Sequence, residues 1–248
     1  MLNHHSYYSF KYGVLSPAEW IEWAREEGEE VLALTDINTS AACIEFSRRA
    51  REAGIKAVAG IDFCKASERQ FIALARDEEA FAEMNHYLSS RLHQDLEAEA
   101  EAPLEKAYVI YPFDRAPKRN LRENEYIGLE PKDLNKLRFS PLKNQSSKMV
   151  ILHPNSFRHK GDYNTHRLLR SIGENCLLSK LPVEKQAPAQ WGLLNSRKLK
   201  ALFSEYPEII SNSERILADC NLDFEFKNYS KALTASIIPT ASPAIARL

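Results

Sequence analysis

The 248-residue sequence lacks any long apolar run, because its purely hydrophobic stretches extend over only a few residues. A membrane-spanning helix requires about 20 consecutive apolar residues, so none is expected. The amino-terminal residues also lack the basic head and the apolar core of a signal peptide. We therefore expect a cytoplasmic protein without membrane contact.

An excess of one charge is also missing, since 33 Lys and Arg residues face 34 Asp and Glu residues, for a formal net charge of −1. DNA-binding proteins normally present a basic face, so this chain is expected to bind DNA weakly or not at all. The cysteines are few and widely spaced, without a CxxC pair: Cys43, Cys64, Cys176 and Cys220. This spacing argues against a zinc ribbon and predicts buried, reduced thiols.

Alternating strand and helix signals run along most of the chain. Ser16 and Glu19 form a capping box around Pro17, and Gly28 lies where that helix should stop. The expected strands cover 31–35, 55–62, 71–75, 108–113, 126–129 and 149–153, and the expected helices cover 17–27, 41–52, 78–93, 164–172, 196–205 and 207–220. Such repeated units predict an α/β fold with mostly parallel strands inside and helices outside, and about seven strands favour closure into a barrel.

Histidines and aspartates follow several of the expected strands. These residues are His4 and His5, after a first strand expected at the amino terminus, and Asp36, Asp62 and His153 after later strands. Ligands collect at the carboxyl ends of strands in parallel barrels, and cations in metal-assisted phosphoesterases need nitrogen and carboxylate ligands from several strands. Each residue also has an ordinary alternative: Asp36 as a helix cap, His153 as a satisfied core histidine and His4 as a solvated side chain.

Several segments resemble, in order and spacing, the PHP domain that opens the alpha subunit of bacterial DNA polymerase III. The segments are 2–13, 32–38, 53–63, 71–81, 126–129, 157–178 and 199–226. The resemblance implies a PHP-type, distorted (β/α)7-like barrel over residues 1–226. Residues 227–248 are expected to be a linker or an unpacked tail.

The sequence departs from the metal-binding members of that family at most ligand positions. The departures are Asn3, Tyr12, Ile37, Gln70, Pro154 and Ser156, while Asp62 replaces a glutamate. The resemblance therefore implies a degenerate metal site, without catalytic or cofactor-binding residues. No cofactor is expected beyond a weakly held divalent metal. The residual candidates for any such binding are His5, Asp36, Asp62 and His153.

The resemblance implies a PHP module of a DNA polymerase III alpha-like protein in DNA replication, structural in role and with an inactive phosphoesterase site. Its partners would be the polymerase core and a proofreading exonuclease. The parent family is a DNA-directed DNA polymerase, which is a nucleotidyltransferase. We do not expect its palm carboxylates in this chain. This chain alone is therefore expected not to be catalytic. An excised domain and a truncated gene product both remain open. The alternatives are a free-standing metal-dependent PHP phosphoesterase or nuclease, and a protein-binding module unrelated to replication.

Overall fold

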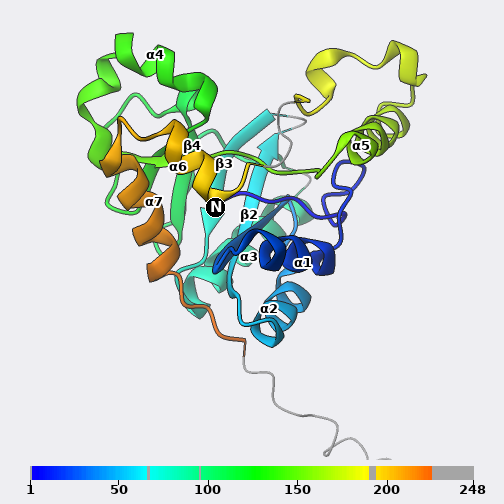
Figure 1. Ribbon diagram of the computed structural model, residues 1–248, viewed down its shortest axis with the longest axis horizontal. Coiled ribbons are helices and arrows are strands. Elements are labelled where there is room, and N and C mark those ends of the chain that lie inside the picture. Colours follow the sequence, from blue (N-terminus) through cyan, green and yellow to red (C-terminus); the bar gives the residue numbers. More distant parts are fainter. Residues whose placement is uncertain (1, 66–67, 95, 190–193, 225–248) are drawn as a thin grey trace, which may run out of the picture.

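The structure is a computed structural model that describes residues 2–65, 68–94, 96–189 and 194–224 (Figure 1). One mixed sheet of six strands, in the order β1 to β6, occupies its centre. The strands are β1 (Val31–Ile37), β2 (Lys56–Lys65), β3 (Glu68–Leu74), β4 (Tyr108–Pro112), β5 (Glu125–Leu129) and β6 (Met149–Ile151). The tail expected at 227–248 lies outside the described residues.

Strand directions are mostly but not entirely parallel. The pairs β1–β2, β4–β5 and β5–β6 are parallel, whereas β3 runs antiparallel to both β2 and β4. A connection of two residues joins β2 to β3, too short for the crossover that a parallel pair needs. The α/β prediction is confirmed, with a reversed third strand and six strands rather than seven within the described residues.

The sheet is curled, and the amino-terminal segment joins its two edges. The carbonyl of His4 accepts a hydrogen bond from Thr35 N on β1 at 2.9 Å. On the other side, Asn155 N donates to the carbonyl of Asn3 and His5 N donates to the carbonyl of Asn155, both at 3.0 Å. Asn155 lies on the segment that continues β6, so the first residues of the chain lie where a seventh strand was expected.

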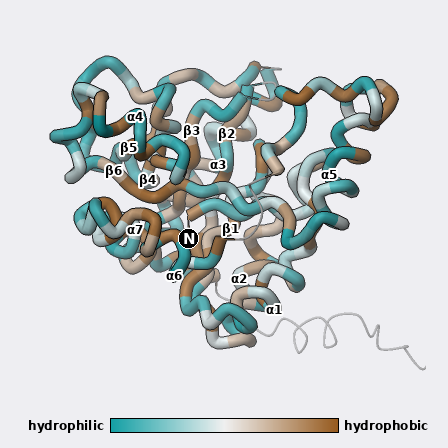
Figure 2. The backbone as a smooth tube through the Cα atoms, turned by 45° about the horizontal axis from the view of Figure 1, so that its top comes forward, coloured by the Kyte–Doolittle hydropathy of each residue, from teal (hydrophilic) through white to brown (hydrophobic). Residues whose placement is uncertain are grey.

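Both faces of the curled sheet are apolar. Alternate residues of the strands point to an inner cluster that includes Ala33, Val58, Ile72, Ile110, Tyr126 and Val150. Their neighbours, such as Leu32, Phe71 and Val109, belong to two outer clusters shared with the helices. Period-2 alternation with both faces covered explains why the strands are hydrophobic throughout, as the brown strand segments in Figure 2 show.

Most of the helices cover the outer face, and the last of them also contributes Ile216 to the inner cluster. They are α1 (Pro17–Glu27), α2 (Cys43–Glu52), α3 (Glu78–His93), α4 (Leu134–Phe139), α5 (Lys160–Gly173), α6 (Ser196–Leu202) and α7 (Pro207–Asp219). The expected capping box of Ser16 and Glu19 is formed, and Gly28 ends α1 in the left-handed conformation at φ 70°. Asp77 caps α3 by accepting from Ala80 N, as expected.

Short 3₁₀ turns fill most of the remaining connections. They are η1 (Phe113–Arg115), η2 (Pro131–Asp133), η3 (Pro141–Asn144), η4 (Ser146–Lys148), η5 (Leu178–Lys180) and η6 (Val183–Lys185). The short helix α4 was not expected from the sequence. Figure 1 shows α5 standing apart from the other helices, beside the loop that precedes α1. Among the described helices, none is both long and apolar enough to cross a membrane.

Candidate functional site

His5 and Asp62 meet inside the curled sheet, in a completely buried position. The Nε2 atom of His5 lies 2.9 Å from Oδ2 of Asp62, and its Nδ1 atom lies 2.9 Å from the hydroxyl of Ser156. An ionised carboxylate only accepts hydrogen bonds, so Nε2 donates to Asp62, and Nδ1 is left to bond with the hydroxyl of Ser156. Both ring nitrogens of His5 are therefore used within the protein.

Arg69 holds the other side of Asp62. Its Nε atom lies 3.0 Å from Oδ1 and 2.9 Å from Oδ2 of Asp62, and its Nη2 atom lies 2.6 Å from Oδ2. The thiol of Cys64 also lies 3.4 Å from Oδ1. Both oxygens of Asp62 thus accept from protein donors, and a guanidinium stands where the sequence suggested a cation could bind.

A β-bulge brings Arg69 to this position. Phe63 pairs with Phe71, but the next residue, Cys64, pairs with Arg69, so Gln70 is left as the extra residue. In a regular ladder Arg69 would point away from Asp62, because side chains alternate between the two faces. The bulge turns Arg69 to the inner side, whereas the side chain of Gln70 donates to the carbonyl of Glu68 at 2.9 Å.

Asp36 is bound by the loop that follows the amino-terminal segment. It accepts from the backbone N and the hydroxyl of Ser6, both at 2.6 Å, and from the hydroxyl of Ser9 at 2.7 Å. The loop comes very close to itself here, since a Cβ on Gly13 would lie 1.7 Å from the carbonyl oxygen of Ser6. Asp36 therefore holds this loop in place through hydrogen bonds and does not cap a helix. The helix α2 has no side-chain cap.

Three of the substituted ligand positions have ordinary structural contacts. Asn3 accepts from the hydroxyl of Thr35 at 2.8 Å. The ring of Tyr12 packs edge-on against His5, with centroids 5.5 Å apart. The backbone N of Ile37, a half-buried residue, donates to the hydroxyl of Ser9 at 3.0 Å. These contacts give none of the three side chains a role in binding a cation.

The remaining candidate histidines belong elsewhere. His4 is completely buried, not solvated, and its Nδ1 atom donates to the carbonyl of Ala33 at 2.9 Å. His153 is buried and lines a different pocket, together with Leu2 and Glu29. The structure thus brings His5 and Asp62 into contact, keeps Asp36 close by through Ser6, and does not bring His153 to them.

His166 is a buried histidine that the sequence did not single out. Its Nδ1 atom lies 2.7 Å from the carbonyl of Tyr12, and its Nε2 atom lies 2.9 Å from the backbone N of Ala187. Burial lowers the pKa of His166 to about 4, although the bond to Tyr12 opposes this effect. The neutral ring therefore fastens α5 and the segment after it to the loop before α1.

The protonation of the two carboxylates follows from their surroundings. Burial alone would raise the pKa of Asp62, but the charge of Arg69 and the hydrogen bonds from His5 and Arg69 lower it to about 2. Burial raises the pKa of Asp36, against the hydrogen bonds from Ser6 and Ser9. Asp62 is thus an anion neutralised by an internal cation.

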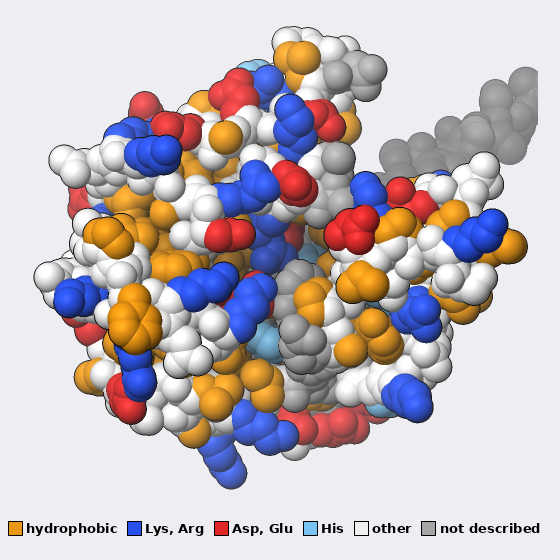
Figure 3. All heavy atoms as spheres, turned by 90° about the horizontal axis from the view of Figure 1, so that it is seen from above, with side chains coloured by type: hydrophobic (Ala, Val, Ile, Leu, Met, Phe, Trp, Pro, Cys, Tyr) orange, Lys and Arg blue, Asp and Glu red, His pale blue; other side chains and the backbone are white. Residues whose placement is uncertain are grey.

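These residues do not fit a metal ion. Within the described ranges, no group of three or more His, Cys, Asp and Glu side chains is arranged to hold one. A cation would have to displace Arg69 from Asp62 and break the hydrogen bonds of Asp36 or His5 before it gained a ligand. Seen from above (Figure 3), the molecule shows Lys and Arg side chains beside a histidine near the middle of its surface.

Comparison with known proteins identifies the fold around this ion pair. The PHP domain family matches residues 2–126. The chain belongs to the PHP domain family. The chain is 34% identical over 84 residues to an error-prone DNA polymerase from Teredinibacter turnerae, a match that covers 34% of this chain and 8% of that polymerase. The chain therefore spans only a small part of the length of this relative.

Solved structures with detectable similarity include hydrolases. An amidohydrolase from Chromobacterium violaceum is 25% identical, with a TM-score of 0.31, over 38% of this chain and 33% of that one. A two-domain protein from Bacteroides vulgatus that contains a predicted PHP-like metal-dependent phosphoesterase is 13% identical, with a TM-score of 0.39, over 67% of this chain and 54% of that one.

Proposed function

We propose that this PHP domain is a structural, non-catalytic module of a DNA polymerase III alpha-like protein that acts in DNA replication. The observation that carries the proposal is the contact of Arg69 with both oxygens of Asp62. A guanidinium in this position supplies the positive charge that a metal would otherwise provide, so the domain needs no metal to keep Asp62 buried.

The similarity to an error-prone DNA polymerase supports the replication context. In that context the module would pack against the polymerase core in the cytoplasm and could hold a proofreading exonuclease. It would need no cofactor. The formal net charge of −1 supports a protein-binding role over direct binding of DNA.

Metal analysis combined with a hydrolysis assay tests the non-catalytic assignment. We expect far less than one Zn²⁺ or Mn²⁺ per purified chain, and no hydrolysis of p-nitrophenyl phosphate above background with added Mn²⁺. Asp62→Asn is the matched control, because it removes the central carboxylate and keeps its shape. Hydrolysis by the wild type that is lost in Asp62→Asn would contradict the proposal and support a phosphoesterase.

The same preparation tests the scaffold role. We expect it to co-elute in gel filtration with the core of an error-prone DNA polymerase from which that enzyme's own PHP domain has been deleted. Its affinity for primed duplex should stay in the non-specific range, with a Kd of about 10⁻⁴–10⁻⁶ M. Nanomolar binding to DNA without binding to the polymerase core would replace the scaffold role by a DNA-binding one.

A further inference from the structure

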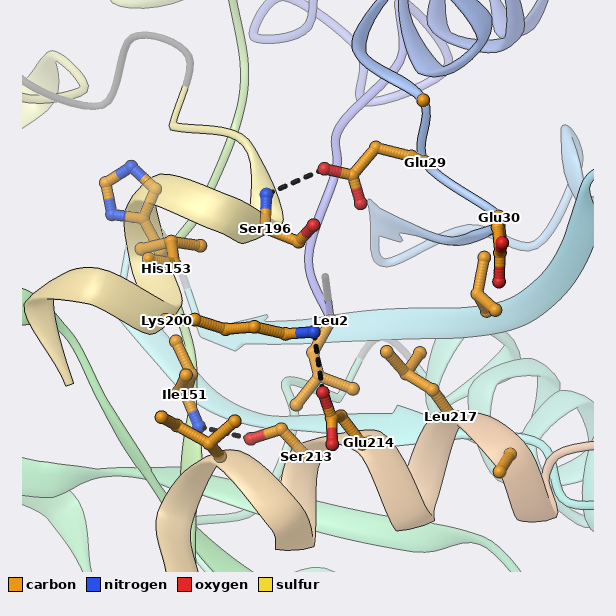
Figure 4. Close-up of a pocket in the computed structure, with 15 residues that line it drawn as sticks. Leu2, Glu29, Glu30, Ile151, His153, Ser196, Lys200, Ser213, Glu214 and Leu217 are labelled. Atoms are coloured by element: carbon orange, nitrogen blue, oxygen red, sulfur yellow. Dashed lines mark hydrogen bonds and ion pairs between the residues drawn. The ribbon is translucent and has the colours of Figure 1, made fainter. Parts of the chain in front are cut away.

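A pocket of about 340 Å³ opens beside the start of β1, between that strand and the helices α6 and α7. Its floor is apolar and includes Leu2, Ile151, Leu199 and Leu217 (Figure 4). A volume of this size is at the lower end of the range for small-molecule pockets. The pocket can therefore receive a short aliphatic group.

The rim of the pocket carries more negative than positive charge. Glu29 and Glu30 lie on one side, and Glu214 lies across from them, in an ion pair with Lys200 at 2.6 Å. Lys200 neutralises Glu214, so the two remaining carboxylates leave a net charge of about −2 along the lining.

Glu29 is the most confined of these carboxylates. It is only 7% exposed, and its Oε1 atom accepts from Ser196 N at 2.7 Å. Figure 4 shows its carboxylate at the edge of the pocket. A largely buried carboxylate at the mouth of a pocket favours a hydrogen-bonding cation over a neutral group.

We infer that this pocket binds a primary ammonium or guanidinium group on a short aliphatic chain. The cation would lie between Glu29 and Glu30, and the aliphatic chain would cover Leu2, Ile151 and Leu217. A lysine or arginine side chain of a partner protein and a free aliphatic amine share this chemistry.

Titration of the ¹⁵N-labelled protein with n-hexylammonium tests the inference, with n-hexanol and hexanoate as probes of equal length and different charge. We expect a millimolar Kd, with shifted amides at Glu29, Ser196 and Ser213. Hexanol should bind about 5-fold more weakly, and hexanoate should not bind. n-Butylammonium should bind about 15-fold more weakly than n-hexylammonium, because each buried methylene contributes about 4-fold.

Three variants locate the binding. Glu29→Gln keeps the acceptor for Ser196 N and should weaken n-hexylammonium about 5-fold, whereas Glu184→Gln, an exposed control on η6, should change nothing. Leu217→Trp should fill the pocket and abolish binding. Should that variant fail to fold, the shifted amides of the wild type still locate the site.

A capped Ala-Lys-Ala peptide distinguishes the two sources of the cation. Binding as tight as that of n-hexylammonium indicates a protein side chain, and binding of the free amine alone indicates a small molecule. Equal affinity for hexanol and n-hexylammonium, equal affinity in Glu29→Gln and the wild type, or shifts away from these residues would overturn the inference.

Discussion

Replacing Arg69 by methionine tests the buried ion pair between Arg69 and Asp62. Methionine keeps much of the apolar stem of the side chain and removes the guanidinium, so Asp62 would remain buried with His5 as its main partner. Asp62 is completely buried and the Arg69 side chain is 14% exposed, so little solvent is available to replace the lost charge. We expect a folded but clearly destabilised protein.

The magnitude follows from the pKa of Asp62. Its folded value of about 2 lies below the usual 3.8, and this gap corresponds to about 2.4 kcal/mol of stability at neutral pH. Because the folded pKa is lowered, this stability is fully present above pH 3.8 and is lost as the pH falls through about 2. Breaking a buried ion pair typically costs about 3–5 kcal/mol, so Arg69→Met should lower the free energy of unfolding at pH 7 by about 3 kcal/mol.

A double-mutant cycle measures the interaction itself. Urea denaturation followed by far-UV circular dichroism at pH 7 would compare the wild type, Arg69→Met, Asp62→Asn and the double variant. We expect a coupling energy of about 2 kcal/mol, because the double variant removes both charges and leaves neither unpaired. Arg115→Met, which breaks the exposed pair with Glu68, is the control and should change stability by at most about 1 kcal/mol. Additivity of the two single changes within about 0.5 kcal/mol would refute direct coupling.

Two further changes test how the loop before α1 is fastened. Between pH 6.5 and 4 the wild type should lose up to about 3 kcal/mol more stability than His166→Asn, because the folded pKa of His166 is lowered to about 4 and the unfolded chain therefore binds this proton first. A proton on Nε2 would also break the bond from Ala187 N, while Nδ1 would still donate to Tyr12. Parallel pH profiles of the two proteins would contradict this linkage. Gly13→Ala should destabilise the fold by at least about 3 kcal/mol in urea denaturation, because its Cβ would lie 1.7 Å from the carbonyl oxygen of Ser6. Gly173→Ala, whose nearest contact is 3.4 Å, is the control, and an equal effect of both changes would contradict the steric argument.

Local signals in the sequence predicted most helices well, because each depends on residues within one turn. The helix α3 begins and ends as expected, since Asp77 accepts from Ala80 N at its start. Strand positions followed from apolar runs in the same way. Strand direction did not, because the reversal of β3 depends on a connection of two residues that the sequence pattern had not marked as a turn.

The candidate site could be predicted only in part. The family resemblance located His5, Asp36 and Asp62, but Arg69 was missed because its position depends on the bulge opposite Cys64. An arginine adjacent to a lost ligand position, here Gln70, is the signal that could have found it. The structure places His153 in the lining of another pocket, which the sequence could not indicate because an apolar strand followed by histidine does not specify the side to which the ring turns.

The two buried carboxylates, Asp62 and Asp36, have partners within the protein. A buried carboxylate without a cation or donors is costly, so Asp62 and Asp36 could persist in this fold only with partners such as Arg69, Ser6 and Ser9. Restoring a single ligand, for example histidine at Asn3, would leave these donors in place and would not recreate a cation site.

The carboxylate of Glu29, in the pocket beside β1, has fewer donors within the protein than the carboxylate of Asp62. Glu29 is almost as buried as Asp62, yet it has one donor, Ser196 N, where Asp62 has Arg69, His5 and Cys64. A carboxylate bonded to a neutral donor next to an apolar floor attracts a cation from outside the protein, whereas a carboxylate paired with an internal guanidinium does not. The ligand-binding capacity of this PHP domain is therefore expected in the Glu29 pocket and not in the position that the family resemblance first suggested.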